Sequence, residues 1–150
     1  SEYNIDTSQV FAVGHSRGAS MALIAALEIP DVIKGACIES GFTEFGYHSR
    51  IENWSGTPMP LVFVHGVLDD DVCIDCTSGG SCGVNPMKPC GSVEASDALV
   101  LMLQESGWNA DRLKYHRLDG VTHRWQPHLN QQCWDFLTQH LHEKAAEASP

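Results

Sequence analysis

The sequence predicts one domain of the α/β class, with helices on both faces of a mainly parallel sheet. Two observations predict this class. Short apolar runs alternate with longer segments of helix-forming residues, in the order strand, helix, strand, strand, helix, strand, helix. The run Leu61–His65 (LVFVH) is continuously apolar up to its last residue, which is typical of a parallel strand buried on both faces. The length of 150 residues fits a single domain.

The four predicted strands are short apolar runs that end at turn-forming residues. They are Gln9–Val13, Ile33–Ile38, Leu61–His65 and Leu113–Leu118. Gly14 ends the first strand, and the pairs Ser40-Gly41 and Asp119-Gly120 close the second and the fourth. Right-handed crossover connections between such strands place the helices on the two faces of the sheet.

The three predicted helices are rich in helix-forming residues and have recognisable ends. They are Ala19–Leu27, Val93–Ser106 and Gln131–Lys144. The first stops before Pro30, and the second lies between Ser92, a residue type that caps helices, and Gly107. The third has the period of an amphipathic helix. Residues 42–57 show no clean period, so no regular element is assigned to them.

The charge of the chain excludes two classes of partner. Lys and Arg number 9 against 19 Asp and Glu, so the formal net charge is −10 with histidine neutral. Nucleic-acid binding needs a cationic surface, and an anionic membrane attracts a polybasic segment. The apolar runs are far shorter than the roughly 18 residues that span a bilayer. We therefore expect no nucleic-acid partner and no membrane span.

The segment Gly14–Gly18 (GHSRG) is the first motif that carries chemistry. It matches G-x-S-x-G between a predicted strand and a predicted helix, a context in which the serine lies on a sharp turn with its hydroxyl exposed. Ser16 is therefore the candidate nucleophile, and the small glycines let strand and helix approach each other. The backbone N–H of Arg17 then lies at a helix N-terminus, where it can face a developing oxyanion. An ordinary glycine-rich turn is the alternative.

A serine hydroxyl needs a base, and the base needs an acid to orient it. In this strand–turn–helix arrangement the acid follows a later strand, and the histidine follows the last one. Asp69 comes just after Leu61–His65, and we choose it over Asp70 and Asp71, which an ordinary solvated turn would explain. His123 lies in the segment after the last predicted strand and is the predicted base.

Three segments of the chain resemble the branch of the α/β-hydrolases that includes polyhydroxybutyrate depolymerases and feruloyl esterases. They are 3–18 (YNIDTSQVFAVGHSRG), 60–72 (PLVFVHGVLDDDV) and 119–127 (DGVTHRWQP). In that branch a strand ending in H-G-x-x-D-x-x-V carries the acid and a loop G-x-x-H-x-W-x-P carries the histidine. These motifs map onto Asp69 and His123. The chain departs from the branch at Arg17, where a small residue or Asn is usual.

The resemblance implies a serine esterase that hydrolyses carboxylic esters, of polyester or of aryl (feruloyl) type, through an acyl-enzyme intermediate. Its substrate would be a small or polymeric ester, and the chemistry implies no cofactor and no metal. A serine peptidase of the prolyl-oligopeptidase type, which has a similar H-G-x-x-D-x-x-V segment, is one alternative. A catalytically inactive binding domain with a hydrolase fold is the other.

The resemblance also implies that part of the fold lies outside this chain. The fold usually places about four strands before the nucleophile and takes a second oxyanion donor from a loop after the third. Fifteen residues precede Ser16 here. We therefore expect residues 1–150 to form a single partial domain, the C-terminal half of an α/β-hydrolase fold. Its partner would be the N-terminal half of the same protein, which the enzyme would need for full activity.

Six cysteines indicate an oxidising compartment, so we expect a secreted or periplasmic protein. Four of them are clustered in one segment: Cys73, Cys76, Cys82 and Cys90. Disulfides are the favoured interpretation, with Cys76–Cys82 nested inside Cys73–Cys90. Other connectivities, a structural zinc ion and free thiols are the alternatives. Cys37 and Cys133 are predicted to be buried thiols.

Three further side chains are candidates for binding the substrate: His15, Trp54 and Trp125. His15 precedes the nucleophile, and aromatic rings stack on aryl or polyester groups. The alternative is that the tryptophans cover the sheet and that His15 is structural. His65, at the end of a predicted strand, is expected to make a structural hydrogen bond.

Overall fold

The computed structural model describes residues 3–41, 47–69 and 93–147. Within these ranges the strands are β1 (Ala12–His15), β2 (Ala36–Glu39), β3 (Leu61–Gly66) and β4 (Leu113–Leu118). The helices are α1 (Arg17–Glu28), α2 (Tyr47–Glu52), α3 (Val93–Glu105) and α4 (Asn130–Glu147), and a 3-10 turn, Pro127–Leu129, precedes α4. The described elements follow the predicted alternation of strands and helices, with α2 added.

The four strands form one parallel sheet in the order β1-β2-β3-β4. Its register places Val13, Cys37, Val62 and Lys114 in one row across the sheet. Because parallel strands all end at the same edge, the segments that follow β1, β3 and β4 meet there. The predicted fold class, a mainly parallel sheet with helices on both faces, is confirmed.

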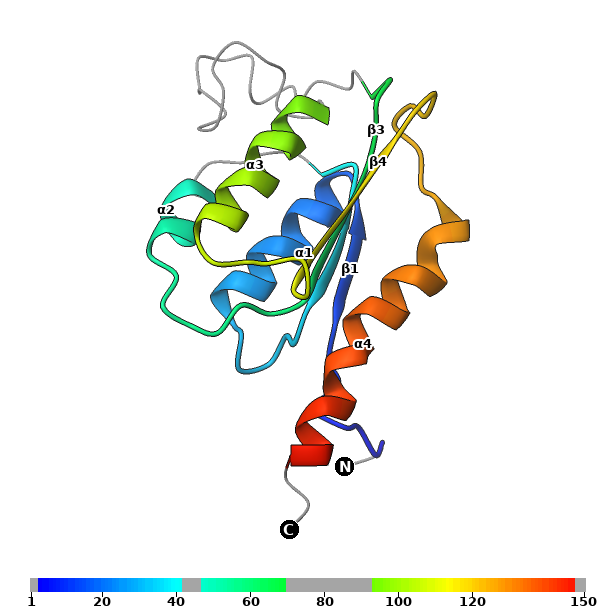
Figure 1. Cartoon of the computed structure of the whole chain (residues 1–150). Coiled ribbons are helices and arrows are strands. Elements are labelled where there is room, and N and C mark those ends of the chain that lie inside the picture. The colour runs from blue at the N-terminus through cyan, green and yellow to red at the C-terminus, as the bar shows by residue number, and fades with distance from the viewer. Residues whose placement is uncertain (1–2, 42–46, 70–92, 148–150) are drawn as a thin grey trace.

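Alternating side chains of the central strands supply two separate cores. Ile38 and Phe63 pack with residues of α1, α2 and α3 on one face of the sheet. Val62 and Val64 point to the other face and pack with Phe136 of α4. Figure 1 shows the same division, with α1, α2 and α3 on one side of the sheet and α4 on the other. The sheet is therefore covered on both faces, as the continuously apolar β3 run predicts.

Helix α2 was not predicted because a six-residue helix has too few turns to show a period. Its position is set by tertiary contacts. The Tyr47 hydroxyl donates to the backbone carbonyl of Ser20 in α1 (2.9 Å), and Ile51 is buried in the core of the first face. Packing against α1 thus decides the structure of a segment whose own sequence gives no signal.

Strands β1 and β2 each begin later than predicted, because hydrogen-bonded turns lie where the predicted strands start. The N–H of Gln9 donates to the carbonyl of Asp6 (3.1 Å). The N–H of Ile33 donates to the carbonyl of Ile29 (2.9 Å), so Ile33 belongs to the turn that ends α1. Apolar side chains in these turns carry the same sequence signal as the strands that follow them.

The two cysteines within the described residues are buried and unbridged, which confirms the prediction for Cys37 and Cys133. Cys37 on β2 faces Cys133 on α4, and the two thiols are hydrogen bonded. This contact and burial raise the pKa of the Cys37 thiol, so the thiol is uncharged at neutral pH. The clustered cysteines lie outside the described residues, so their pairing stays a prediction: Cys73, Cys76, Cys82 and Cys90.

Candidate active site

Ser16 lies on the turn between β1 and α1 and has a strained backbone. Its φ of 58° and ψ of −128° fall in a region that residues other than glycine rarely adopt. The Ser16 N–H donates to the carbonyl of Glu39 on β2 (2.9 Å). The Ser16 carbonyl accepts from the N–H of Ala19 in the first turn of α1 (3.0 Å). Bonds to β2 and to α1 therefore hold the strained turn and fix the direction of the Ser16 side chain.

Close packing at this turn requires glycine at position 14. A Cβ on Gly14 would lie 2.1 Å from the carbonyl oxygen of Gly18 and 2.6 Å from the backbone nitrogen of Ala19. Both are backbone atoms, so they cannot rotate away. Gly18 differs, because no atom of the described residues beyond its chain neighbours and the backbone of its own helix lies within 4 Å of the place its Cβ would take. We expected both glycines to be needed for close packing. The structure excludes a side chain at Gly14 but has room for one at Gly18.

Gly14→Ala and Gly18→Ala make a matched pair of substitutions with opposite expected effects. Gly14→Ala should lower the free energy of unfolding by about 1–3 kcal/mol, because the strand and the helix must move apart. Gly18→Ala should raise it by up to about 1 kcal/mol, because alanine favours the helix. Urea unfolding of both variants measures the two changes. Destabilisation of equal size in both would contradict the steric role assigned to Gly14.

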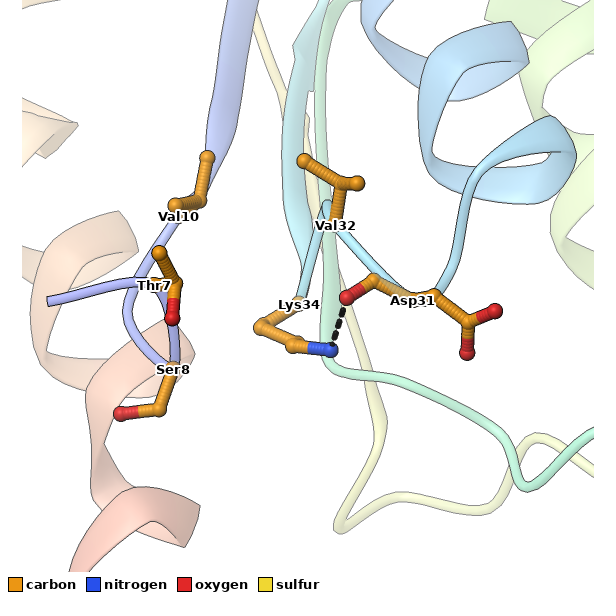
Figure 2. Close-up of a pocket in the computed structure, with 6 residues that line it drawn as sticks. All are labelled: Thr7, Ser8, Val10, Asp31, Val32 and Lys34. Carbon is orange, nitrogen blue, oxygen red and sulfur yellow. Dashed lines mark hydrogen bonds between the residues drawn. The ribbon is translucent and has the colours of Figure 1, made fainter.

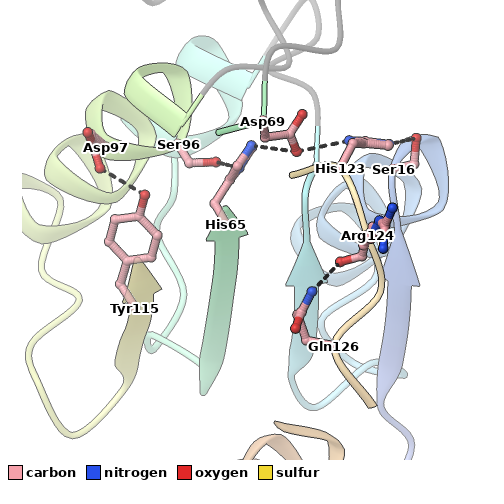
Figure 3. A network of polar contacts seen from close by, with 9 residues as sticks. All are labelled: Ser16, His65, Asp69, Ser96, Asp97, Tyr115, His123, Arg124 and Gln126. Carbon is pink, nitrogen blue, oxygen red and sulfur yellow. Dashed lines mark hydrogen bonds and ion pairs between the residues drawn. The ribbon is translucent and has the colours of Figure 1, made fainter. Parts of the chain in front are cut away.

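The side chains of Ser16, Asp69 and His123 form one line of hydrogen bonds (Figure 3). The Ser16 hydroxyl oxygen lies 2.8 Å from Nε2 of His123, and Nδ1 of His123 lies 2.9 Å from Oδ2 of Asp69. The Asp69 side chain is fully buried, and that of His123 is 20% exposed. A carboxylate only accepts, so His123 carries its proton on Nδ1 and its Nε2 accepts from the Ser16 hydroxyl. The structure thus brings together the three residues that the sequence singles out.

The segments that carry the acid and the base pack against each other through their backbones. The N–H of Leu68, in the segment after β3, donates to the carbonyl of Val121, in the segment after β4 (2.8 Å). Gly66 permits this approach, because a Cβ there would lie 2.3 Å from the same carbonyl oxygen. Asp69 and His123 are therefore held at hydrogen-bond distance by the backbone as well as by their own contact.

Glu39, the last residue of β2, ties the His123 segment to the sheet. Its buried carboxylate accepts the backbone N–H of Gln126, three residues after His123. Burial raises the pKa of Glu39 to about 7, and the hydrogen bond from Gln126 opposes part of this rise. The backbone carbonyl of Glu39 also accepts the N–H of Ser16. One residue of β2 therefore contacts both the nucleophile turn and the segment of the base.

The raised pKa of Glu39 should make its contribution to stability fall as the pH rises. In the unfolded chain the glutamate ionises with a pKa of 4.5, whereas in the folded protein its pKa is about 7. The unfolded state therefore loses its proton first. Raising the pH from 4.5 to about 7 therefore lowers the free energy of unfolding by roughly 3 kcal/mol. Below pH 4.5 Glu39 causes no such loss.

Glu39→Gln keeps an oxygen that accepts from Gln126 and removes the ionisation. In urea unfolding we expect the free-energy difference between variant and wild type to be constant below about pH 4.5. It should then grow in favour of the variant up to about pH 7. A difference that does not change with pH would show that Glu39 titrates like an exposed glutamate.

The backbone N–H of Arg17 lies at the amino end of α1, next to Ser16. Helix α1 has 12 residues and no acidic side chain in its first turn, so no carboxylate there offsets the positive end of its dipole. Such a helix end favours a negative charge. Arg17 is the first residue of α1, so its N–H is one of those at the helix end that no carbonyl within the helix accepts.

Two of the three predicted substrate-binding residues contact each other, and one of them, His15, lies beside His123. The ring of His15 is centred 4.8 Å from that of His123 and 6.0 Å from that of Trp125. Burial, followed by the neighbouring His123, lowers the pKa of His15, so its ring is uncharged at neutral pH. Trp54 instead packs on the buried Trp108, with ring centres 5.4 Å apart, against the core of the first face. Trp54 therefore takes the alternative role, which is to cover the sheet.

A hollow of about 370 Å³ lies at the opposite edge of the sheet (Figure 2). It is formed by the segments that precede β1 and β2, and its lining residues are Thr7, Ser8, Val10, Asp31, Val32 and Lys34. The Lys34 ammonium donates to the backbone carbonyls of Asp31 (2.6 Å) and Pro30 (3.3 Å). Its charge therefore stabilises the turn after α1, and the hollow is separate from the edge that carries Ser16.

Sequence reasoning missed two residues that support this arrangement. Glu39 ends the apolar run ACIE, and a carboxylate at the end of a buried strand is a signal that could have been used. The hydroxyl of Ser96 is hydrogen bonded to the buried His65, and no pattern in the sequence of the helix around Ser96 indicates such a partner. Asp70 and Asp71, the alternative acids, lie outside the described residues.

The described residues offer neither a cluster of metal ligands nor a helix that could span a membrane. Among residues 3–41, 47–69 and 93–147, no three or more His, Cys, Asp or Glu side chains are grouped so that they could hold a metal ion. In the same part of the chain no helix combines the length and the apolar character needed to cross a bilayer.

Comparison with known proteins gives likenesses of structure only. No protein-family model matches the chain, and no curated protein matches it. SOBER1 from Arabidopsis thaliana superposes with a TM-score of 0.65 at 19% identity, over 91% of this chain and 55% of that one. Esterase PE8 has a TM-score of 0.58 at 23% identity, over 93% and 52%. A putative dipeptidyl aminopeptidase IV from Bacteroides ovatus has a TM-score of 0.57 at 14% identity, over 95% and 19%.

The chain has the α/β-hydrolase fold. It spans about half the length of SOBER1 and of esterase PE8. Because the identities are below 25%, the likenesses establish the fold alone. A fold hosts many activities, so the function has to be argued from the side chains at the carboxyl edge of the sheet.

Proposed function

We propose that this chain carries the catalytic residues of a serine hydrolase that cleaves carboxylic esters. One observation carries the proposal: the Ser16 hydroxyl, the His123 imidazole and the buried Asp69 carboxylate are hydrogen bonded in sequence. A nucleophile, a base and an orienting acid in this order are the parts that acyl transfer requires. The strained backbone of Ser16 adds support, since strain of this kind is found at functional sites.

In the first half of the reaction, Ser16 Oγ attacks the ester carbonyl carbon. His123 Nε2 takes the hydroxyl proton as the new C–O bond forms, and Asp69 stabilises the resulting imidazolium. The carbonyl oxygen becomes an oxyanion, and in this proposal the Arg17 N–H, at the amino end of α1, donates to it. His123 then gives the proton to the leaving alcohol oxygen, the ester C–O bond breaks, and an acyl-enzyme remains on Ser16.

In the second half, water replaces the alcohol. His123 removes a proton from water, which attacks the acyl carbon, and the same proton returns to Ser16 Oγ as the acyl–serine bond breaks. The products are a carboxylic acid and the regenerated hydroxyl. No electron transfer occurs, so the chemistry needs no redox cofactor.

The substrate class we propose is an ester with an aryl or polyester acyl group. The support is the resemblance of GHSRG, HGVLDDDV and GVTHRWQP to polyhydroxybutyrate depolymerases and feruloyl esterases. The rings of His15 and Trp125, close to His123, offer a surface on which such a group could stack. We further propose secretion or a periplasmic location, on the ground that Cys73, Cys76, Cys82 and Cys90 suit an oxidising compartment.

Hydrolysis of paired substrates tests this proposal. The chain is assayed together with the N-terminal half of the same protein, which we expect it to need for full activity, on p-nitrophenyl butyrate, methyl ferulate and an aminoacyl p-nitroanilide. We expect turnover of one or both esters and none of the anilide, because no group that would bind a peptide terminus is recognised in the sequence. Faster cleavage of the anilide would favour the peptidase alternative. No turnover of any substrate would favour the inactive binding domain.

A further inference from the structure

His65 is a buried histidine that contacts the acid of the proposed triad. It is the fifth residue of β3, and its side chain is 1% exposed. Its Nε2 lies 3.1 Å from Oδ2 of Asp69, and its Nδ1 lies 2.7 Å from the hydroxyl oxygen of Ser96 on α3. Figure 3 shows His65 between Ser96 and Asp69, with His123 on the far side of the carboxylate.

The position of each proton follows from the partners. The Asp69 carboxylate accepts only, so Nε2 of His65 donates to it. Nδ1 of a neutral imidazole is then an acceptor, and the Ser96 hydroxyl can donate to it. One N–H and one lone pair of the imidazole thus match one acceptor and one donor. His65 is therefore held in a single tautomer from both sides.

Both histidines contact the same oxygen of Asp69. Oδ2 lies 2.9 Å from Nδ1 of His123 and 3.1 Å from Nε2 of His65. The Asp69 side chain has no exposed surface, so protein donors replace water around its charge. The donor from His65 fixes the direction in which Oδ2 points, and it remains in place while His123 gains and loses its second proton.

We propose that His65 is a positioning residue for the proposed esterase: it donates a second hydrogen bond to Oδ2 of Asp69, while Ser96 holds its ring in the tautomer that can donate. The kinetic consequence of this inference rests on the proposed function. The geometry of the inference does not. It assigns to α3, through Ser96, a part in orienting the catalytic acid. The sequence analysis expects His65 to make only a structural hydrogen bond. In that case, a substitution at His65 that keeps the protein equally stable would leave kcat unchanged.

The tautomer can be measured without any activity. In the full chain labelled with ¹⁵N-histidine, two-bond correlations between the ring nitrogens and the carbon-bound protons distinguish the tautomers, and His65→Gln identifies the His65 signals. We expect a proton on Nε2 and none on Nδ1. A proton on Nδ1, alone or together with one on Nε2, would overturn the proposal. This result holds whether or not the chain hydrolyses esters.

Two substitutions separate positioning from packing. In His65→Gln the amide nitrogen reaches the place of Nε2, so a donor to Asp69 is kept. In His65→Asn the amide reaches only the place of Nδ1, so the contact with Ser96 is kept and the donor to Asp69 is lost. We expect His65→Asn to lower kcat for the ester by about 10- to 100-fold with KM changed less than about twofold. His65→Gln should recover most of that loss.

The control is His116→Asn on the neighbouring strand β4, where His116 pairs with Val64. It should leave kcat unchanged. Equal kcat in His65→Asn and wild type, or equal losses in His65→Asn and His65→Gln at equal urea midpoints, would overturn the positioning role. If the wild-type chain hydrolyses no ester, the proposed function fails, and the tautomer measurement still decides the placement of the His65 proton.

Discussion

Replacing Ser16 by alanine is expected to lower kcat for ester hydrolysis by about 10⁶-fold. The reason is that Ser16 Oγ, which is hydrogen bonded to His123 Nε2, is the atom that bonds to the acyl carbon. KM should change little, because Ser16 Oγ forms its bond to the substrate during the reaction and not on binding. Steady-state hydrolysis of p-nitrophenyl butyrate, with the protein concentration verified by amino-acid analysis, measures the loss.

Ser16→Gly is the matched control for folding. Glycine tolerates a φ of 58°, whereas alanine does not, so Ser16→Gly should be more stable than Ser16→Ala by about 1 kcal/mol. Both variants should lose activity to the same extent, which separates loss of the hydroxyl from loss of structure. Ser49→Ala, on the exposed surface of α2, should keep full activity. Activity within tenfold of wild type in Ser16→Ala would contradict the assignment of the nucleophile.

Asp69→Asn is expected to lower kcat by about 10⁴-fold while the fold is kept. The substituted amide would present an N–H or a neutral oxygen to His123, and an N–H there forces the imidazole proton onto Nε2. His123 could then no longer accept from Ser16. The loss should be smaller than that of Ser16→Ala, because the hydroxyl and the helix end remain. Steady-state kinetics of the two variants on the same ester gives the comparison.

Asp97→Asn provides the control, because Asp97 is a half-buried aspartate outside the site. Asp97 accepts from the Tyr115 hydroxyl (2.8 Å) and pairs with Arg117 (3.3 Å), between α3 and β4. Its replacement should change stability by no more than about 1 kcal/mol and leave kcat unaltered. Equal losses of kcat in Asp69→Asn and Asp97→Asn would indicate that Asp69 acts only through stability.

The fold was predictable because its signals are local. The apolar run of β3, the alternation of strands and helices, and the order of the motifs all lie in short stretches of sequence. The choice of Ser16, Asp69 and His123 used the same locality, since each follows the end of a strand and parallel strands end at one edge. The meeting of three distant side chains was therefore foreseeable from topology.

The contacts that support the site were not predictable, because they join elements far apart in the chain. Glu39 reaches Gln126 across 87 positions, and Ser96 reaches His65 across 31. A buried glutamate or a helical serine has no periodic signature of such a partner. Trp54 is a residue for which the sequence left two roles open. An aromatic residue in a segment with no assigned element could line a substrate pocket or pack in the core. Its packing on Trp108 favours the core.

Labelling with a fluorophosphonate tests the central claim most directly, because the reagent phosphonylates only a serine activated by its neighbours. The full chain is treated with the reagent, its mass is measured intact, and the modified peptide is sequenced by mass spectrometry. We predict one adduct, on Ser16, that is absent in Ser16→Ala and in Ser16→Gly. An adduct that persists in Ser16→Ala, or an unmodified wild-type chain that nevertheless hydrolyses esters, would contradict the account.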